Sequence, residues 1–154
     1  MTKINLKSFP GMTSTIERKK IEDARNYVRD ISNETQVWAL VSVMGDKLKL
    51  ARKGKEYHEL MQYLLDTDMA FAYVKIIMGD DVSKRDKFVL ISWVGSEVSS
   101  VKKGRMLVPR NEIDTIFDQR AKVIEASDVS ELAIENVKEL LVKAGGADYG
   151  TSTS

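Results

Sequence analysis

The chain has 154 residues, of which 43% are hydrophobic and 31% charged, with a formal net charge of +1. These values are typical of one globular domain and leave too little chain for two ordinary ones. They argue against a general nucleic-acid binder, which is usually more basic, and the absence of cysteine excludes disulfides and cysteine-based zinc sites. The longest apolar runs are far too short to span a bilayer, so we expect no membrane insertion.

The first predicted helix follows an N-terminal stretch without clear periodicity. Residues 1–13 show no helical or strand pattern, and we expect a flexible arm there. Ser14 and Glu17 then have the spacing of a capping box, in which the two side chains bind each other's backbone N–H groups. Apolar residues recur behind them at helical spacing and predict an amphipathic helix over about 15–31.

Two strands and a second helix are predicted next. Residues 37–43 are rich in β-forming side chains, and residues 47–51 alternate polar and apolar. Gly45 and Asp46 between them predict a tight hairpin turn. Residues 54–66 place their apolar side chains on one helical face.

A second pair of strands follows at 69–78 and 87–94. The later strand is almost continuously apolar, which predicts a central position in the sheet. The segment between the strands is polar and predicts a turn. Trp38 and Trp93 lie within strand patterns, and we expect both in the core.

The last third of the chain gives a mixed pattern. Residues 99–122 contain a helical signal, but Pro109 must start, kink or break that helix. A short strand is predicted at 123–126. A cap signal at Asp128 then precedes a last amphipathic helix, which we expect Gly145 and Gly146 to end.

This order of elements predicts an α+β fold with three α/β/α layers, in which a mixed sheet carries helices on its faces. We expect the flexible arm at 1–13, a single domain over 14–149 and a flexible tail at 150–154.

Catalytic signatures are weak. His58 is the one histidine, so a histidine-based metal site is excluded and a general base is hard to assign. Asp80 and Asp81 lack a third metal ligand at a suitable spacing. The glycine pair follows a helix instead of preceding one, which does not suit phosphate binding. We therefore expect no enzyme activity, no cofactor and no metal.

Two basic clusters are candidates for binding a partner. One comprises Lys84, Arg85 and Lys87, and the other Lys102, Lys103 and Arg105. Spacing alone favours ordinary solvated surface for both clusters. Neither cluster has the interleaved aromatic residues that stack on bases, so an acidic protein surface is the better candidate partner.

Several sequence strings resemble one family, the coactosins and coactosin-like proteins of the ADF-homology superfamily, which also contains cofilin. The resemblance covers about 15–149 and is carried by strings in a specific order: Val37-Trp38, Gly54-Lys55-Glu56-Tyr57, Phe71-Ala72-Tyr73-Val74, Ser83-Lys84-Arg85-Asp86-Lys87-Phe88, Leu90-Ile91-Ser92-Trp93-Val94-Gly95 and Lys143-Ala144-Gly145-Gly146-Ala147-Asp148-Tyr149.

The resemblance implies the ADF-homology fold, a five-stranded mixed sheet flanked by about four helices. It also implies non-catalytic binding to actin filaments in the cytoplasm and cytoskeleton. Basic residues of the first cluster contribute to filament contact in the coactosin family, and by position these are Lys84, Arg85 and Lys87. Lys87 is the leading candidate.

The second cluster matches a motif of cofilin-type relatives at the start of their long helix. Lys103-Gly104-Arg105-Met106 occupies that place here, with Lys102 beside it. The last helix and the turn before it supply three further candidates, Glu131, Glu135 and Lys138.

Three alternatives stay open. Cofilin-like activity would add binding of monomeric actin, severing and depolymerisation. A role as a scaffold or chaperone for an enzyme partner is a second alternative, and a small enzyme using His58 is a third. The cofilin-style serine directly after the initiator Met is absent, and Ser8 and Ser14 are its candidate substitutes, although Ser14 suits a helix cap better. The sequence does not define the oligomeric state.

Overall fold

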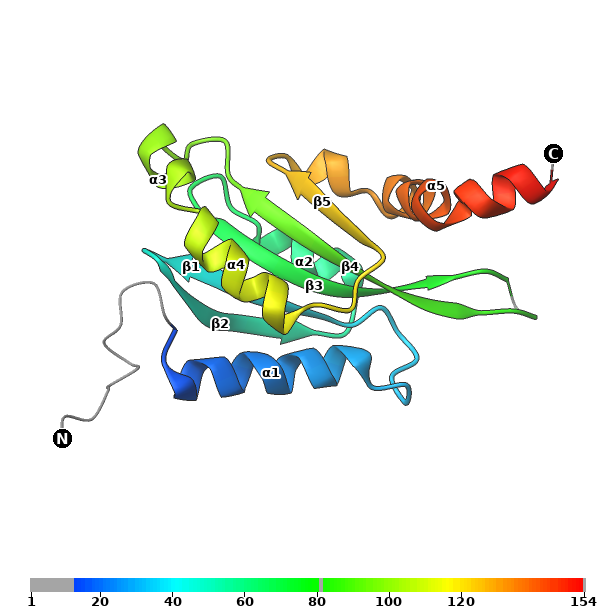
Figure 1. Cartoon of the computed structure of the whole chain (residues 1–154), viewed down its shortest axis with the longest axis horizontal. Coiled ribbons are helices and arrows are strands. Elements are labelled where there is room, and N and C mark those ends of the chain that lie inside the picture. Colours follow the sequence, from blue (N-terminus) through cyan, green and yellow to red (C-terminus); the bar gives the residue numbers. More distant parts are fainter. Residues whose placement is uncertain (1–12, 81, 154) are drawn as a thin grey trace.

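The computed structural model describes residues 13–80 and 82–153, with side chains up to residue 145. One five-stranded sheet organises the chain, and Figure 1 shows helices on both of its faces. The strands are β1 (Trp38–Met44), β2 (Lys47–Gly54), β3 (Met69–Met78), β4 (Arg85–Val94) and β5 (Lys122–Ala126). The helices are α1 (Thr15–Arg29), α2 (Tyr57–Leu60), α3 (Ser100–Gly104), α4 (Leu107–Ile116) and α5 (Ile134–Thr153), with 3-10 turns η2 (Met61–Tyr63) and η3 (Val129–Leu132).

The strand order is β2-β1-β3-β4-β5, with antiparallel pairs except for the parallel pair β4–β5. The prediction that the 87–94 strand is central needs correction, because the middle position belongs to β3. β4 is still an interior strand with a neighbour on each side, which explains its apolar sequence on both faces.

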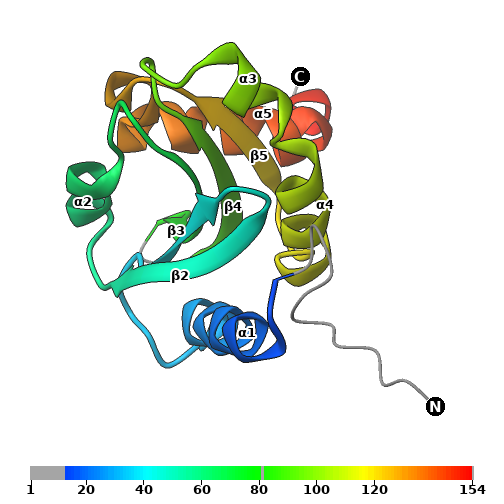
Figure 2. The same cartoon turned by 90° about the vertical axis from the view of Figure 1, so that its left-hand side faces the viewer.

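The sheet separates two hydrophobic clusters. Figure 2 shows the helices arranged around the sheet. On one face, buried residues of β1, β3 and β4 pack against α2 and α5, and on the other they pack against α1 and α4. We call these the α2/α5 face and the α1/α4 face. Because each strand alternates its side chains, Trp38 and Trp93 lie in the α2/α5 cluster, which confirms both as core residues. The predicted three-layer α+β architecture is correct.

The start of α1 follows only half of the predicted capping box. The Ser14 hydroxyl accepts the N–H of Glu17 at 3.2 Å, as expected. The Glu17 carboxylate instead turns towards the sheet and accepts the N–H of Leu50 on edge strand β2 at 3.4 Å. Thr13, which we expected in the flexible arm, is buried and binds both Leu48 N and Glu112 Oε1. Residues 1–12 lie outside the described part of the chain.

The predicted helix over 54–66 is much shorter. Only α2 and η2 form, and Leu65 is exposed instead of joining the apolar face. A capping box between Glu56 and Glu59 starts α2. The chain then turns so that Leu65 O can accept the Trp93 indole N–H at 2.8 Å.

Two separate helices form within 99–122, in agreement with the predicted interruption of the helical signal. Gly104 is the last residue of α3, and Pro109 lies buried in the first turn of α4. A proline in the first helical turn loses no intrahelical hydrogen bond, so α4 accommodates Pro109 as its third residue. Arg120 lies beyond the helix, although its sequence pattern suggested a place within it.

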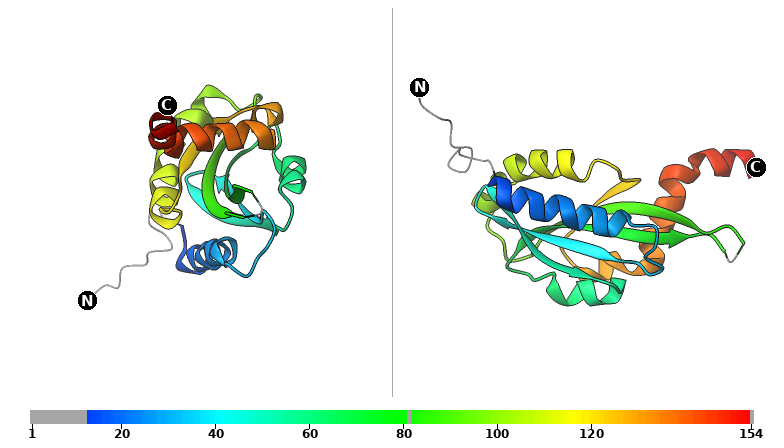
Figure 3. Two further views of the ribbon diagram at one scale, coloured as in Figure 1. Left: turned by 90° about the vertical axis from the view of Figure 1, so that its right-hand side faces the viewer. Right: turned by 90° about the horizontal axis from the view of Figure 1, so that it is seen from below.

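The prediction that Gly145 and Gly146 end the last helix is wrong. Helix α5 continues through both glycines to Thr153. The ribbon of α5 changes direction along its length in Figure 3. Residues 150–153 of the predicted tail therefore lie in this helix. Within the described residues, none of the helices combines the length and apolarity that crossing a bilayer demands.

Candidate functional site

The β3–β4 hairpin carries the first basic cluster and projects beyond the rest of the sheet (Figure 1). Its turn is held by Asp80, whose carboxylate accepts the N–H groups of Val82 and Ser83, both at 2.9 Å. These two hydrogen bonds lower the pKa of Asp80 below its ordinary value. Gly79 adopts φ +92°, a conformation that favours glycine. Asp80 thus fixes the backbone of Val82 and Ser83 just before the cations of β4.

Strand alternation sorts the charges of this segment onto two faces. Arg85 pairs with Met78 and Lys87 with Ile76, so both cations project on the α2/α5 face. Asp86 projects on the α1/α4 face. Arg85 and Lys87 therefore share one face, and Asp86 points away from it. We call Lys84, Arg85 and Lys87 together the hairpin patch, in which Lys84 directly precedes the strand.

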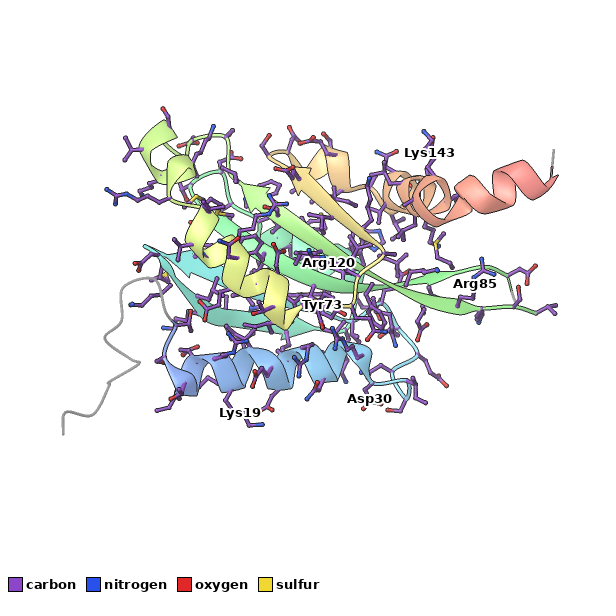
Figure 4. All side chains as sticks on the ribbon, viewed as in Figure 1. Lys19, Asp30, Tyr73, Arg85, Arg120 and Lys143 are labelled. Atoms are coloured by element: carbon purple, nitrogen blue, oxygen red, sulfur yellow. The ribbon has the colours of Figure 1, made fainter. Side chains whose placement is uncertain are left out.

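Helix α5 lies on the same face of the sheet as the hairpin patch. Val137 and Leu141 bury their side chains against the sheet. Glu135 and Lys138 are exposed on the outer side of the helix. Figure 4 shows Arg85 on the hairpin and Lys143 on α5 at the same end of the molecule. Helix α5, which carries Lys138, thus lies on the face of the sheet from which Arg85 and Lys87 project.

The second basic cluster lies around α3, at the opposite end of the sheet (Figure 1). Ser99 caps α3, and Lys102, Lys103 and Arg105 are exposed. We call these three cations the α3 patch. The resemblance to cofilin-type relatives predicted that these residues start a long helix. The structure differs, because α3 ends at Gly104 and Arg105 lies in the link before α4. Met106, the last residue of the cofilin-type string, is buried in the core.

Two grooves flank the α3 patch. Lys103 and Leu107 line a groove of about 560 Å³ that runs between the α3–α4 link and the end of β5. Lys102 and Arg105 line a second groove of about 280 Å³ beside the β1–β2 turn. The cations of one short helix therefore point to two sides.

Glu131 belongs with the α3 patch and not with the hairpin patch. It lines the same groove as Lys103. Its carboxylate oxygen Oε1 accepts the N–H groups of Ser127 at 3.0 Å and Asp128 at 2.9 Å, which completes the capping box of η3. The carboxylate of Glu131 thus has a structural task at the start of η3.

The two patches are separated by the length of β4. Arg85 begins this strand and Val94 ends it, and α3 follows shortly after Val94. Nine residue steps of an extended strand correspond to roughly 30 Å. The structure therefore does not merge the two basic clusters into one site.

Most cations of the two patches lack an ion pair, a property that they share with Lys49, Lys55 and Lys122 elsewhere among the described residues. Five of the six cations in the two patches have no carboxylate within 4.0 Å of their charged groups, across residues 13–80 and 82–145. These five are Lys84, Lys87, Lys102, Lys103 and Arg105. The same holds for Lys138 on α5. Several cations on α1 are paired instead, for example Lys19 with Asp23 at 2.8 Å. The charges of these candidates are thus not neutralised by an ion pair within the described residues.

Four apolar side chains near the α3 patch were not singled out from the sequence. Val101 and Leu107 are 67% and 66% exposed, and Val108 and Met44 are exposed as well. Val101 lies in α3 and Leu107 and Val108 lie in α4, while Met44 ends β1, so these exposed positions come together only in the fold. Exposed apolar residues that cluster beside charge are typical of protein contact surfaces.

The remaining titratable groups have structural tasks. The Tyr73 hydroxyl donates to Gln119 O and accepts from Arg29 Nε at 2.9 Å, and burial raises the pKa of Tyr73. Arg29 also binds Asp118 at 3.0 Å and lowers the pKa of that carboxyl. His58 is exposed. In the described part of the chain, no three His, Asp or Glu side chains gather as metal ligands would.

Comparison with known proteins agrees with this geometry. Residues 14–141 match the family described as cofilin/tropomyosin-type actin-binding protein. The chain is 32% identical to the coactosin-like protein of Bos taurus over 142 residues, which cover 92% of this chain and 99% of the relative.

Solved structures give the same result. Human coactosin-like protein superposes with a TM-score of 0.76 at 29% identity, covering 82% of this chain and 96% of that one. Mouse coactosin, described as an actin filament binding protein, has a TM-score of 0.70 at 29% identity and covers 90% and 96%. With its ADF-homology fold, the chain therefore belongs to the cofilin/tropomyosin-type actin-binding protein family, in which its relatives are coactosin-like proteins.

Proposed function

We propose that this protein binds along actin filaments without catalysing a reaction, and so regulates actin dynamics in the cytoplasm and cytoskeleton. The observation that carries the proposal is the hairpin patch, whose Lys84 and Lys87 lack carboxylate partners among the described residues. Membership of an actin-binding family supports it, as does the description of mouse coactosin as a filament-binding protein.

Binding would depend on charge complementarity. The surface of actin is acidic, and unpaired cations on a projecting hairpin speed association and set the orientation of the complex. Lys87 is half-buried, so its stem is held by the strand while its amine is available. The side chains of Glu135 and Lys138 on α5 would add contacts beside the hairpin.

The test is co-sedimentation with actin filaments, comparing wild type with Lys87→Ala and Lys19→Ala. Lys19 is the matched control, because it is an exposed lysine already paired with Asp23 on α1 (Figure 4). We expect Lys87→Ala to weaken filament binding roughly tenfold, which corresponds to about 1.4 kcal/mol. Lys19→Ala should bind like wild type.

Each outcome has a clear meaning. If wild type stays in the supernatant at low salt, filament binding is refuted. If wild type pellets and Lys87→Ala pellets equally well, filament binding stands but the hairpin patch is the wrong site. Equal loss in both variants would indicate a general charge effect.

A second candidate function is binding of monomeric actin with severing, as in cofilin. It is favoured by the groove of about 560 Å³ beside the α3 patch, where exposed Leu107 lies next to Lys103. Leu107→Ser together with Lys103→Ala should then abolish monomer binding, measured by fluorescence of labelled actin. Imaging of single filaments would show whether wild type cuts them, and intact filaments under full decoration would exclude severing.

A further inference from the structure

Strand β3 contains one charged residue within an otherwise apolar sequence. Lys75 is 0% exposed, and Val74 and Ile76 on either side of it are also buried. A charged amine removed from water is strongly unfavourable unless it is both hydrogen-bonded and paired. The partners of Lys75 therefore show what its burial achieves.

Lys75 joins three segments of the chain. Its amine donates to the carbonyl oxygen of Asn33 and, at 3.5 Å, to that of Asp30, both in the loop between α1 and β1. It also forms an ion pair with the Asp86 carboxylate on β4 at 3.7 Å. One buried amine thus links this loop to both strands of the hairpin.

These contacts lie where the hairpin leaves the sheet. Strand β1 pairs with β3 only as far as Val74, and β5 pairs with β4 only from Val89 onward. Residues 75–78 and 85–88 therefore form a two-stranded ribbon without a further strand on either side. An isolated two-stranded ribbon is at best marginally stable in water.

The loop after α1 takes the place of the missing strand. Val37 O accepts the backbone N–H of Lys75 at 2.9 Å, and the Gln36 side-chain oxygen accepts that of Ile77 at 3.0 Å. The loop is itself anchored to α1, because the Asn33 side-chain amide donates to Tyr27 O at 2.8 Å. The base of the hairpin is thus connected to α1 through Lys75.

We infer that Lys75 is a positioning residue that sets the direction of the β3–β4 hairpin and thereby presents the hairpin patch to the filament. This role rests on the proposed filament binding. Lys75 acts in two ways: it holds the ribbon against the loop, and it pairs with Asp86, which strand alternation places on the face opposite Arg85 and Lys87.

The test uses Lys75→Met, which keeps an unbranched apolar side chain but removes the charge. Val28→Ala is the matched control, since Val28 is a fully buried core residue of α1 on the same face of the sheet and makes no contact of this kind. We expect Lys75→Met to lower filament affinity about tenfold in co-sedimentation. The amides of residues 84–88 should exchange with solvent faster in Lys75→Met than in Val28→Ala, even when urea denaturation shows equal overall stability.

A double-mutant cycle with Lys87→Ala distinguishes positioning from general destabilisation. If Lys75 acts by placing Lys87, the loss caused by Lys87→Ala will be smaller in the Lys75→Met background. In the Val28→Ala background the two losses should add.

The outcomes separate this inference from the proposed function. If wild type binds filaments but Lys75→Met and Lys87→Ala are additive, or hairpin exchange is unchanged, the positioning role is refuted while filament binding stands. If wild type does not bind filaments, the proposed function fails, and the role of Lys75 in filament contact fails with it.

Discussion

Replacing Tyr57 by phenylalanine should destabilise the fold through one hydrogen bond. The Tyr57 hydroxyl, on α2, donates to Leu132 O at 2.6 Å, and both residues are buried on the α2/α5 face. Phenylalanine fills the same space but leaves that carbonyl without the hydroxyl donor. An unsatisfied buried acceptor costs about 1–3 kcal/mol. For a domain of this size, that corresponds to a fall in Tm of roughly 2–12 °C.

The same substitution should change how steeply the free energy of unfolding falls as the pH becomes alkaline. Burial raises the pKa of Tyr57 above its ordinary value of 10.0. The unfolded chain therefore loses this proton at a lower pH than the folded chain does. The contribution of Tyr57 to the free energy of unfolding is therefore fully present below pH 10.0 and declines as the pH rises from there towards the folded-state pKa. Tyr57→Phe removes this contribution, so its stability should decline less steeply.

Urea denaturation at neutral pH and above pH 10.0 measures both effects. Tyr63→Phe is the control, because the Tyr63 ring packs near Trp38 while its hydroxyl has no hydrogen bond within the described residues. Some alkaline loss should persist in Tyr57→Phe, since burial also raises the pKa of Tyr73. A neutral-pH stability equal to wild type, or an unchanged alkaline slope, would refute the reasoning.

Three further predictions follow from the structure. Filament affinity should fall as salt rises, because exposed charges are screened; co-sedimentation that does not vary with salt would contradict the electrostatic account. Gly95→Ala should destabilise the fold by about 1–3 kcal/mol, since a Cβ there would lie 2.1 Å from Asp66 O. A Cβ at Gly104 would meet nothing within 4 Å, so Gly104→Ala should stabilise α3 by up to about 1 kcal/mol. Thermal denaturation measures both variants, and a higher Tm for Gly95→Ala than for Gly104→Ala would contradict this reasoning. Arg29→Met should raise the lowered pKa of Asp118 towards its ordinary value, as measured by NMR titration. In wild type the stability from this pair is lost as the pH falls through the lowered pKa, and the variant should lack this contribution at every pH. An unchanged pKa of Asp118 in the variant would show that Arg29 is not the cause of the shift.

Local sequence patterns predicted most elements correctly because their signals depend on near neighbours. The apolar spacing of α1, the hairpin turn at Gly45 and the β-rich strands are all short-range features. One error arose where a distant contact overrode a local preference, because the Glu17 carboxylate binds a backbone N–H of β2 instead of completing the capping box. The continuation of α5 through Gly145 is a second error, since glycine is a common helix end, and no contact of Gly145 explains it.

The candidate site divides in the same way. The sequence by itself determined which residues are basic. The structure begins β4 at Arg85, within the segment that the sequence predicted as a turn, and so places Arg85 and Lys87 on one face and Asp86 on the other. Only the tertiary structure decided which cations have carboxylate partners, that Glu131 lies beside Lys103, and that Lys75 is buried at the base of the hairpin. The physical reason is that pairing and burial depend on residues brought together from distant parts of the chain, which no local pattern specifies.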